Sequence, residues 1–316
     1  MNAIFSDFAN LTPRFLFSDV LYKCVKSLLN QTIEDIEIIL LPDVYEKLTF
    51  EDPRISIVVR LGSPSEKRNL GVKLAKSENI AFIDDDAYAP ENWIEIGVRN
   101  LSQESIVGGP NIMAPENNAK REASDLFYTY KLGTMRELYR YKPVGTKRYV
   151  DNLGTVNLFI LKRVFVEVGG FDGKFWPGED TYLYEKLKKN GYKIFYDPSL
   201  FVYHRRREVF YSHLKQLWEY AKYRGHALKR GEVKLFYLIP SLLLIVTASL
   251  TIVTIIYDVL FFVLFLLGFV AVSAITFTTF LKRSHSIKAS LLGLITFWLS
   301  HLAYSVGVFR GLISWD

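Results

Sequence analysis

Three consecutive aspartates, Asp84, Asp85 and Asp86, are the residues of this chain whose types and spacing most clearly suggest chemistry. They directly follow the apolar run 80–83, so they lie where a buried strand would end. Adjacent carboxylates repel one another, and a hard divalent cation, with a diphosphate supplying further oxygen ligands, would relieve that repulsion. The alternative is a solvated acidic turn without chemistry. Other features of the sequence bear on which of these two alternatives applies.

The segments around the aspartates alternate between strand and helix patterns. A short apolar run that ends at a polar residue predicts a buried strand, and apolar residues three and four apart predict a helix. Strands are expected at 36–41, 55–59, 80–83, 156–161 and 192–196, and helices at 20–29, 65–76 (with Leu70 and Leu74 inward) and 179–190. This order predicts an α/β fold with a mostly parallel sheet, which binds ligands beyond the carboxyl ends of its strands.

The polar, basic and aromatic stretch 111–150 has weak periodicity. It is expected to form irregular structure and short helices around an acceptor site. At the start of the chain, 1–17 is a poor strand pattern, in which only Asn10 could serve as the polar residue that closes an opening strand.

The last third of the chain is apolar enough to enter a membrane. The runs 235–257 and 259–281 hold no charged residue, and in 289–309 the one ionisable side chain is His301. Each is about as long as a helix that crosses a ~30 Å hydrocarbon core, although the third could instead lie in the membrane interface. Lys282, Arg283 and Lys288 place the loop before the third run in the cytoplasm.

The charge pattern points to the same compartment. The formal net charge is +6, and 205–234 alone carries nine Lys or Arg against three Glu. Its position before the first apolar run suits an anionic cytoplasmic leaflet better than nucleic acid, so no nucleic-acid partner is expected. Within it, 208–230 is amphipathic and fits either an interfacial helix or an ordinary bundle helix. The single cysteine, Cys24, excludes an intramolecular disulfide and a cysteine-based zinc site.

Several segments together resemble the family-2, GT-A type inverting glycosyltransferases. The resemblance rests on DVLYKCVKSLLNQTIEDIEIILL at 19–41, on GSPSEKRNLGVKLAKSENIAFIDDDAYAPENW at 62–93, and on GGFD, Gly-Glu-Asp and GYKIFYDPSLFVYHRRR between 169 and 207. It covers about 19–230. The tail ending HLAYSVGVFRG resembles members that build exopolysaccharides and lipid-linked glycans. A GT-A (Rossmann-like) mixed, mostly parallel sheet flanked by helices is therefore expected, followed by a transmembrane helical region.

The resemblance implies roles for individual residues. Asp84 and Asp86 match the DxD metal pair, and Asp180 matches the catalytic base that accepts the proton of the acceptor. His204, at a strand end, could complete the metal or diphosphate site as a neutral imidazole, or be merely structural. Donor-binding residues are expected to be Asp43, Arg68, Asn69, Asp85, Arg206 and Arg207, and acceptor-binding residues Trp176 and Glu179. The three arginines Arg205, Arg206 and Arg207 are expected to divide between diphosphate contacts and membrane-surface charge. Core packing for Trp176, and a helix-start charge for Glu179, are the alternatives.

The expected organisation is a cytoplasmic catalytic domain at 1–204, a basic amphipathic interfacial segment at 205–234 and a transmembrane region at 235–316. The predicted activity is metal-dependent, inverting transfer of a single hexose from a nucleotide-sugar donor to a membrane-associated, lipid-linked glycan acceptor at the cell membrane. The Leu41-Pro42-Asp43-Val44 sequence departs from the usual Asp-Asp-Gly-Ser, which leaves nucleotide preference open. Two other functions stay open: a polyprenyl-phosphate sugar synthase, or a non-catalytic membrane-bound scaffold.

Overall fold

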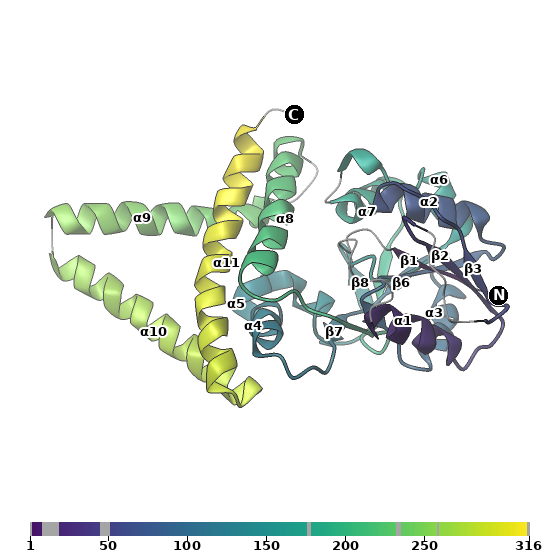
Figure 1. Cartoon of the computed structure of the whole chain (residues 1–316). Helices are drawn as coiled ribbons and strands as arrows, with labels where there is room; N and C mark the ends of the chain where they lie inside the picture. The colour runs from purple at the N-terminus through teal and green to yellow at the C-terminus, as the bar shows by residue number, and fades with distance from the viewer. Residues whose placement is uncertain are drawn as a thin grey trace. The chain divides into compact units, whose positions relative to one another are not determined.

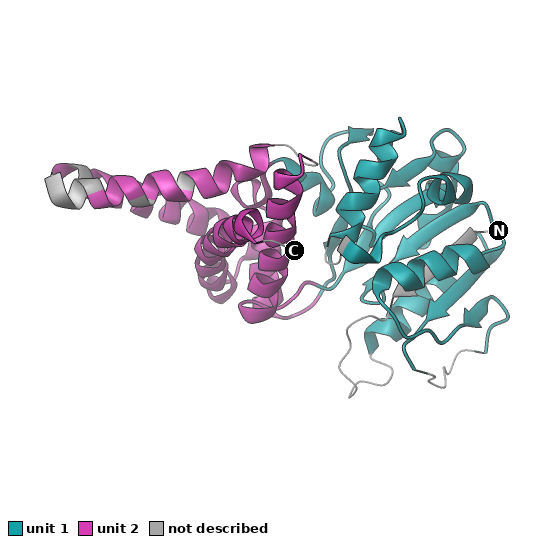
Figure 2. Cartoon of the chain, turned by 90° about the horizontal axis from the view of Figure 1, so that it is seen from above, with its two compact units in different colours: residues 1–115, 136–205 teal, residues 116–135, 206–316 magenta. Residues whose placement is uncertain are grey.

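The structure is a computed structural model, and it describes residues 2–7, 19–44, 51–175, 178–231, 235–257 and 259–314. The chain forms two compact units (Figure 2). The first, an α/β unit, combines residues 1–115 with 136–205. The second, a helical unit, combines residues 116–135 with 206–316.

The α/β unit is built on an eight-stranded mixed sheet in the described part of the chain, with strand order β3-β2-β1-β4-β9-β6-β10-β8 (Figure 1). Strands β3, β2, β1 and β4 are parallel neighbours, and β9 runs antiparallel to both β4 and β6. A small sheet, β5-β11-β7, lies beside it. The strands are β1 (Asn2–Asp7), β2 (Ile36–Leu41), β3 (Ile55–Ile57), β4 (Asn79–Ile83), β5 (Ala87–Tyr88), β6 (Ile106–Gly108), β7 (Asn111–Met113), β8 (Arg148–Val150), β9 (Asn157–Leu161), β10 (Ile194–Tyr196) and β11 (Val202–His204).

Helices flank this sheet, and the predicted α/β class is confirmed. They are α1 (Asp19–Leu29), α2 (Pro64–Leu74), α3 (Trp93–Leu101), α6 (Lys162–Glu167) and α7 (Glu179–Lys189), with the 3-10 helices η1 (Met135–Arg140) and η2 (Gly173–Phe175). All six residues of β2 and the last four of β4 are buried. The four apolar residues that precede the aspartates thus lie in the core, so the turn after β4 starts from a fixed point.

Two expectations were wrong. The stretch 2–7 is strand β1, which pairs in parallel with β2 on one side and with β4 on the other. Strands on both sides form hydrogen bonds with its backbone. Its apolar run is too short to give a periodic signal in the sequence. Leu74 does not face inward, since it is 42% exposed. Helix α2 instead buries Lys67, Arg68, Gly71 and Val72, so a polar part of the helix faces the interior.

The helical unit contains α4 (Ala119–Tyr128), α5 (Lys131–Thr134), α8 (Tyr211–Lys229), the 3-10 helix η3 (Leu235–Leu238), α9 (Ile239–Tyr257), α10 (Val259–Ser284) and α11 (Ile287–Ile313). Besides the residues after 205, it takes in 116–135. The reason is packing: Leu126 lies against Gly293 of α11, and Tyr130 stacks edge-on against Phe280 of α10. Three helical segments, Leu235–Ile252, Phe262–Ser284 and Ile287–Ile313, are long and apolar enough to cross a membrane.

Helices α8 and α11 lie side by side in the same direction. His213 Nε2 is 2.9 Å from Ser300 Oγ near one end, and His226 Nε2 is 3.3 Å from Ser314 Oγ near the other. Between these points small residues bring the backbones together: a Cβ at Gly307 would lie 2.8 Å from Ala221 Cβ. The amphipathic pattern of 208–230 therefore corresponds to a helix that packs on another helix.

The α8–α11 contact predicts a stability difference between two glycines. A Cβ at Gly311 would overlap the backbone oxygen of Lys222, whereas nothing lies within 4 Å of a Cβ at Gly268 in α10. Gly311→Ala should lower the free energy of unfolding of the helical unit by about 1–3 kcal/mol, as overpacking does. The matched Gly268→Ala should leave it unchanged or slightly higher, because alanine favours helices. Thermal unfolding in detergent compares the two, and equal midpoints would contradict the close packing.

Candidate active site

The three aspartates occupy the turn that joins β4 to the small sheet. Strand β4 ends at Ile83, and the Ala87 amide donates to the Asp84 carbonyl oxygen over 3.0 Å, which closes the turn before β5 begins. Buried Cys24 of α1 lies below it, with Sγ 3.6 Å from the same oxygen. The turn is thus held by the core, while the Asp84 and Asp86 side chains stay 30% and 45% exposed.

Strand pairing brings His204 to this turn from far along the chain. In the small sheet β11 runs antiparallel to β5, with His204 in register with Ala87, and the Arg205 amide donates to the Asp86 carbonyl oxygen over 3.0 Å. This places His204 Nε2 3.0 Å from Asp86 Oδ1. A residue 118 positions after the aspartate thus becomes its direct neighbour.

Asp84, Asp86 and His204 fit a divalent cation. One ligand atom from each lies within 4.8 Å of the other two. Carboxylate oxygens and a neutral imidazole nitrogen are ligands that Mn²⁺ accepts, and carboxylates suit Mg²⁺. His204 Nδ1 is buried and has no hydrogen-bond partner among the described residues, so the ring is not committed to a structural role through that atom. The predicted trio therefore lies together, as a metal site would require.

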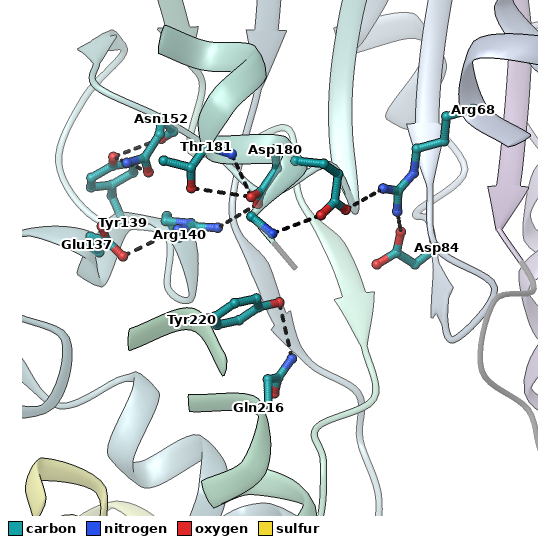
Figure 3. Close-up of polar contacts among 12 residues, drawn as sticks. Arg68, Asp84, Glu137, Tyr139, Arg140, Asn152, Asp180, Thr181, Gln216 and Tyr220 are labelled. Carbon is teal, nitrogen blue, oxygen red and sulfur yellow. Dashed lines mark hydrogen bonds and ion pairs between the residues drawn. The ribbon is translucent and has the colours of Figure 1, made fainter. Parts of the chain in front are cut away.

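Arg68 links this cluster to the start of α7. Its guanidinium donates to Glu179 Oε1 over 2.9 Å and to Asp84 Oδ1 over 3.3 Å, and its side chain is only 9% exposed (Figure 3). Helix α2 presents Arg68 from a well-defined start, where Ser63 and Glu66 form a capping box. Because charge-assisted bonds are strong and directional, Arg68 fixes the acidic turn relative to α7.

Glu179 is a buried partner of Arg68. Burial raises the pKa of Glu179, the neighbouring charge of Asp180 raises it further, and the Arg68 guanidinium and the Gly178 amide act in the opposite direction. The Gly178 amide donates to Glu179 Oε2 over 3.0 Å. With one oxygen held by Arg68 and the other by the backbone, Glu179 has the contacts of a residue that holds the site together.

Asp180 lies one residue further into α7 and is held at both carboxylate oxygens. The Thr181 amide donates to Oδ1 over 2.6 Å, and Arg140 Nη2 lies 3.6 Å from Oδ2 (Figure 3). Arg140 Nη1 is also 3.3 Å from Glu137, within the 3-10 helix η1. Arg140 was missed in the sequence because it lies in the aperiodic stretch 111–150, where no motif marks it. These contacts hold the Asp180 carboxylate in one orientation, with its side chain 19% exposed.

The other predicted donor residues of the α/β unit have structural contacts. The Asn69 amide donates to the Phe171 carbonyl oxygen over 2.8 Å and accepts from the Phe171 amide over 2.9 Å, so it holds the Gly169–Asp172 segment. Asp43 Oδ1 lies 2.8 Å from Nζ of the fully buried Lys67. Asp85 is half-buried beside the cluster and does not belong to the metal-compatible trio.

The basic residues after His204 separate into different environments. Arg206 is buried in the helical unit, with its Nε 2.9 Å from Asp125 Oδ1 and its guanidinium over the Tyr128 ring. We therefore leave Arg206 out of the proposed donor site, because its charge is already matched by Asp125. Arg207 is exposed. Trp176, predicted to contact the acceptor, lies outside the described residues.

Replacing Arg68 by lysine tests its bridging role. A lysine keeps the positive charge but cannot donate in parallel to two carboxylates, so Arg68→Lys should lower turnover by about 10- to 100-fold, the equivalent of one charge-assisted hydrogen bond. The control is Arg54→Lys, since Arg54 pairs with Asp52 away from the acidic turn. Turnover of Arg68→Lys within about twofold of the wild type would contradict the role.

The mixed sheet, with an acidic turn at the carboxyl end of a central strand and a histidine from a neighbouring sheet, defines a GT-A type glycosyltransferase fold. The crystal structure of GalNAc-T7 with UDP, GalNAc and Mn²⁺ shares that fold. It superposes with a TM-score of 0.50 at 14% identity, over 74% of this chain and 51% of that chain.

Residues 14–165 match the model of glycosyl transferase family 2, so this chain carries a family-2 glycosyltransferase domain. The chain is 23% identical to the glycosyltransferase GlyG of Streptococcus pneumoniae, over 62% of this chain and 70% of GlyG. It is 32% identical to the glycosyltransferase EpsH of Bacillus subtilis over 34% of each chain. The chain therefore spans much of GlyG but only about a third of EpsH.

Proposed function

We propose that the chain transfers one sugar from a nucleotide-sugar donor to an acceptor hydroxyl at the cytoplasmic face of the cell membrane, with inversion at the anomeric carbon. The observation that carries the proposal is the meeting of Asp84, Asp86 and His204 in one cluster, linked through Arg68 to the helix that begins with Glu179 and Asp180. Within a family-2 domain, this pairing joins a leaving-group site to a candidate base.

In the proposed reaction Asp180 acts on the acceptor. Its carboxylate takes the hydroxyl proton while the acceptor oxygen forms a bond to the anomeric carbon. The bond between that carbon and the diphosphate oxygen breaks, and the nucleoside diphosphate leaves. A single displacement of this kind inverts the anomeric centre. Thr181 and Arg140 keep the carboxylate oriented throughout, because each contacts one of its oxygens.

Asp84, Asp86 and His204 would hold Mg²⁺ or Mn²⁺, which when bound offsets the negative charge that develops on the departing diphosphate. Arg68 keeps Asp84 in place for this purpose. Asp43, Asp85 and Arg207 remain candidates for contacts with the donor, and Glu179 is proposed to position Asp180 and the acceptor side of the site. The division into a catalytic domain at 1–204, a basic segment at 205–234 and a membrane region at 235–316 is part of the same proposal.

A lipid-linked glycan is the proposed acceptor. The three apolar helical segments that are long enough to cross a membrane support it, because confinement to the same surface raises the effective concentration of a lipid-borne acceptor. One detergent-solubilised preparation should be offered a polyprenyl-diphosphate sugar and the same sugar without lipid. Transfer to the lipid-linked form should be clearly more efficient, and equal efficiency would overturn this acceptor.

The activity itself is tested by measuring nucleoside-diphosphate release across a panel of nucleotide sugars with Mg²⁺ or Mn²⁺. Release that depends on an acceptor hydroxyl, with a product whose anomeric proton shows inverted coupling by NMR, is the expected result. Transfer only to a polyprenyl phosphate would identify a polyprenyl-phosphate sugar synthase. Donor binding without turnover over the whole panel would identify a non-catalytic scaffold.

A further inference from the structure

The apolar segment at the end of the chain has two different faces in the structure. The window Ile287–Ile313, helix α11, is 44% buried inside the protein, whereas the two other membrane candidates are each 6% buried. Its buried side is mostly small or polar and includes Ser290, Gly293, Thr296, Ser300 and Gly307, with Phe297 and Val308 among them. Its exposed side carries Lys288 and Arg310 near its two ends and a stripe of large aliphatic residues: Ile287, Leu291, Ile295, Leu299, Leu302, Val306 and Ile313.

The buried side of α11 packs on helices that carry charge. Along its first half it contacts α4 and the residues after it, through Leu126 at Gly293 and Tyr130 at Phe297. Along its second half it contacts α8, from His213 at Ser300 to His226 at Ser314. Helix α4 carries Lys120, Arg121, Glu122 and Asp125, and α8 carries Lys215, Glu219, Lys222, Arg224 and Lys229.

The charged side chains of α8 make it unfavourable for this helix to enter the hydrocarbon core. Its buried residues His213, Leu217, Ala221 and Gly225 repeat every four positions and face α11. At 100° per residue, Lys215, Glu219 and Lys222 fall on the opposite side of the helix. Lys215 is exposed, and Glu219 and Lys222 are half-buried, so this charged side makes the helix costly to immerse in lipid. Because α8 accompanies α11 from Ser300 to Ser314, that half of α11 is excluded from the core as well, and α4 excludes the other half.

Helices α9 and α10 are less buried than α11, and their surroundings are less charged. They extend from the rest of the helical unit as a hairpin (Figure 1). The hairpin starts and ends on α11, where the Tyr304 hydroxyl donates to the Tyr237 carbonyl oxygen over 3.1 Å and Trp298 Nε1 donates to Ser273 Oγ over 3.1 Å. The exposed residues of both helices are mostly apolar, as lipid contact requires, and the exposed charged residues Lys282 and Arg283 lie in the last turn of α10.

We infer that α11 does not cross the membrane but lies along its surface, with the aliphatic stripe facing the lipid and α4 and α8 on the aqueous side. Only the α9–α10 hairpin enters the hydrocarbon core. The occupant of the stripe is thus the bilayer interface, and the hairpin that starts and ends on α11 continues the same lipid-contacting surface. The inference goes beyond the proposed function and does not depend on catalysis.

The inference has a direct consequence for topology. A helix that crosses would place its two ends on opposite sides of the membrane, whereas a surface helix keeps both on one side. Lys288 and Arg310 lie near the two ends of α11, and Lys229 lies at the end of α8; all three are exposed. Their separation in α11 also suits a crossing helix with flanking basic residues, so the sequence alone does not decide between the two arrangements.

Cysteine labelling in sealed vesicles separates them. Lys229→Cys, Lys288→Cys and Arg310→Cys would each be placed in a Cys24→Ser background and treated with a membrane-impermeant maleimide from either side. All three should react from the same side, with at least about tenfold more labelling there than from the other. Because Lys229 lies near the Arg310 end of α11, a crossing helix would put 310 and 229 on the side opposite to 288. Labelling of position 310 from the side opposite to 288 would overturn the inference.

Depth measurements decide the matter if position 310 reacts from neither side. Spin labels at the exposed positions Leu291, Leu299 and Val306 would be compared for accessibility to oxygen and to a water-soluble nickel complex. A surface helix should give nearly equal depths at the three positions. A depth that is greatest at 299 and shallow at both ends would show that α11 crosses. Because these measurements need no enzyme activity, the inference about α11 can be overturned whether or not the proposed function is correct.

Discussion

Asp86→Ala should lower sugar transfer at least about 1,000-fold. The variant removes one carboxylate from the Asp84, Asp86 and His204 cluster and also removes the Asp86 partner of His204, 3.0 Å away. If the cation offsets leaving-group charge by several kcal/mol, a loss of about 4 kcal/mol corresponds to that factor. Initial rates of nucleoside-diphosphate release, measured at saturating donor and Mn²⁺, check the prediction.

The matched control is the adjacent carboxylate. Asp85→Ala makes the same chemical change in the same turn but leaves the trio intact, so its loss should be much smaller. Binding of Mn²⁺ followed by electron paramagnetic resonance gives a second readout, in which Asp86→Ala loses the bound signal and Asp85→Ala keeps it. An active Asp86→Ala variant, or a wild type that is fully active in excess chelator, would remove the metal from the mechanism.

The sequence predicts the local parts of this site well and its long-range contacts poorly. Strand β4 follows from an uninterrupted apolar run and strand β2 from a run broken only by Glu37, and their positions agree with prediction to within a residue. Those runs are buried on both faces, so hydrophobicity alone marks them. The acidic turn after β4 follows from the same signal. The DxD pair is thus a local feature, readable from a few adjacent residues.

Other parts of the site depend on contacts between distant segments. His204 meets Asp86 only because β11 pairs with β5, and Arg68 meets Glu179 across 111 positions. Neither pairing has a signal in the local pattern of either segment. Arg140 is a third case, since its partners Glu137 and Asp180 become visible only when η1 lies beside α7. The resemblance to a family marked His204 and Arg68 as candidate site residues, but it gave nothing for Arg140.

The helical unit shows a different limit of sequence analysis. Three apolar runs of similar composition look alike in the sequence, yet the α11 segment is 44% buried, against α4 and α8, while the α9 and α10 segments are each 6% buried. Hydropathy shows which segments are apolar enough to enter lipid. The packing of the folded chain determines whether protein or lipid actually surrounds each segment. Arg206 illustrates the same point at one residue. It follows a predicted metal ligand by two positions, yet it pairs with Asp125 in the helical unit.

Asp180→Asn should lower turnover at least about 100-fold, the usual effect of removing a general base. The asparagine has nearly the same shape, and its carbonyl oxygen can still accept from the Thr181 amide, which now donates to Asp180 Oδ1 over 2.6 Å. It cannot take the acceptor proton. Donor affinity should change little, because the expected donor-side contacts come from the Asp84 and Asp86 cluster and from Arg68.

Glu185→Gln is the matched control, since it removes one negative charge from the same helix, where Glu185 pairs with Lys188. It should retain turnover within about twofold. Thermal midpoints of both variants near the wild-type value would confirm that the asparagine, although it turns an amide toward Arg140 or Thr181, leaves α7 folded. A fall in donor affinity as large as the fall in turnover would instead assign Asp180 to the donor site, and Arg140 would then be the residue that shapes that site by holding it.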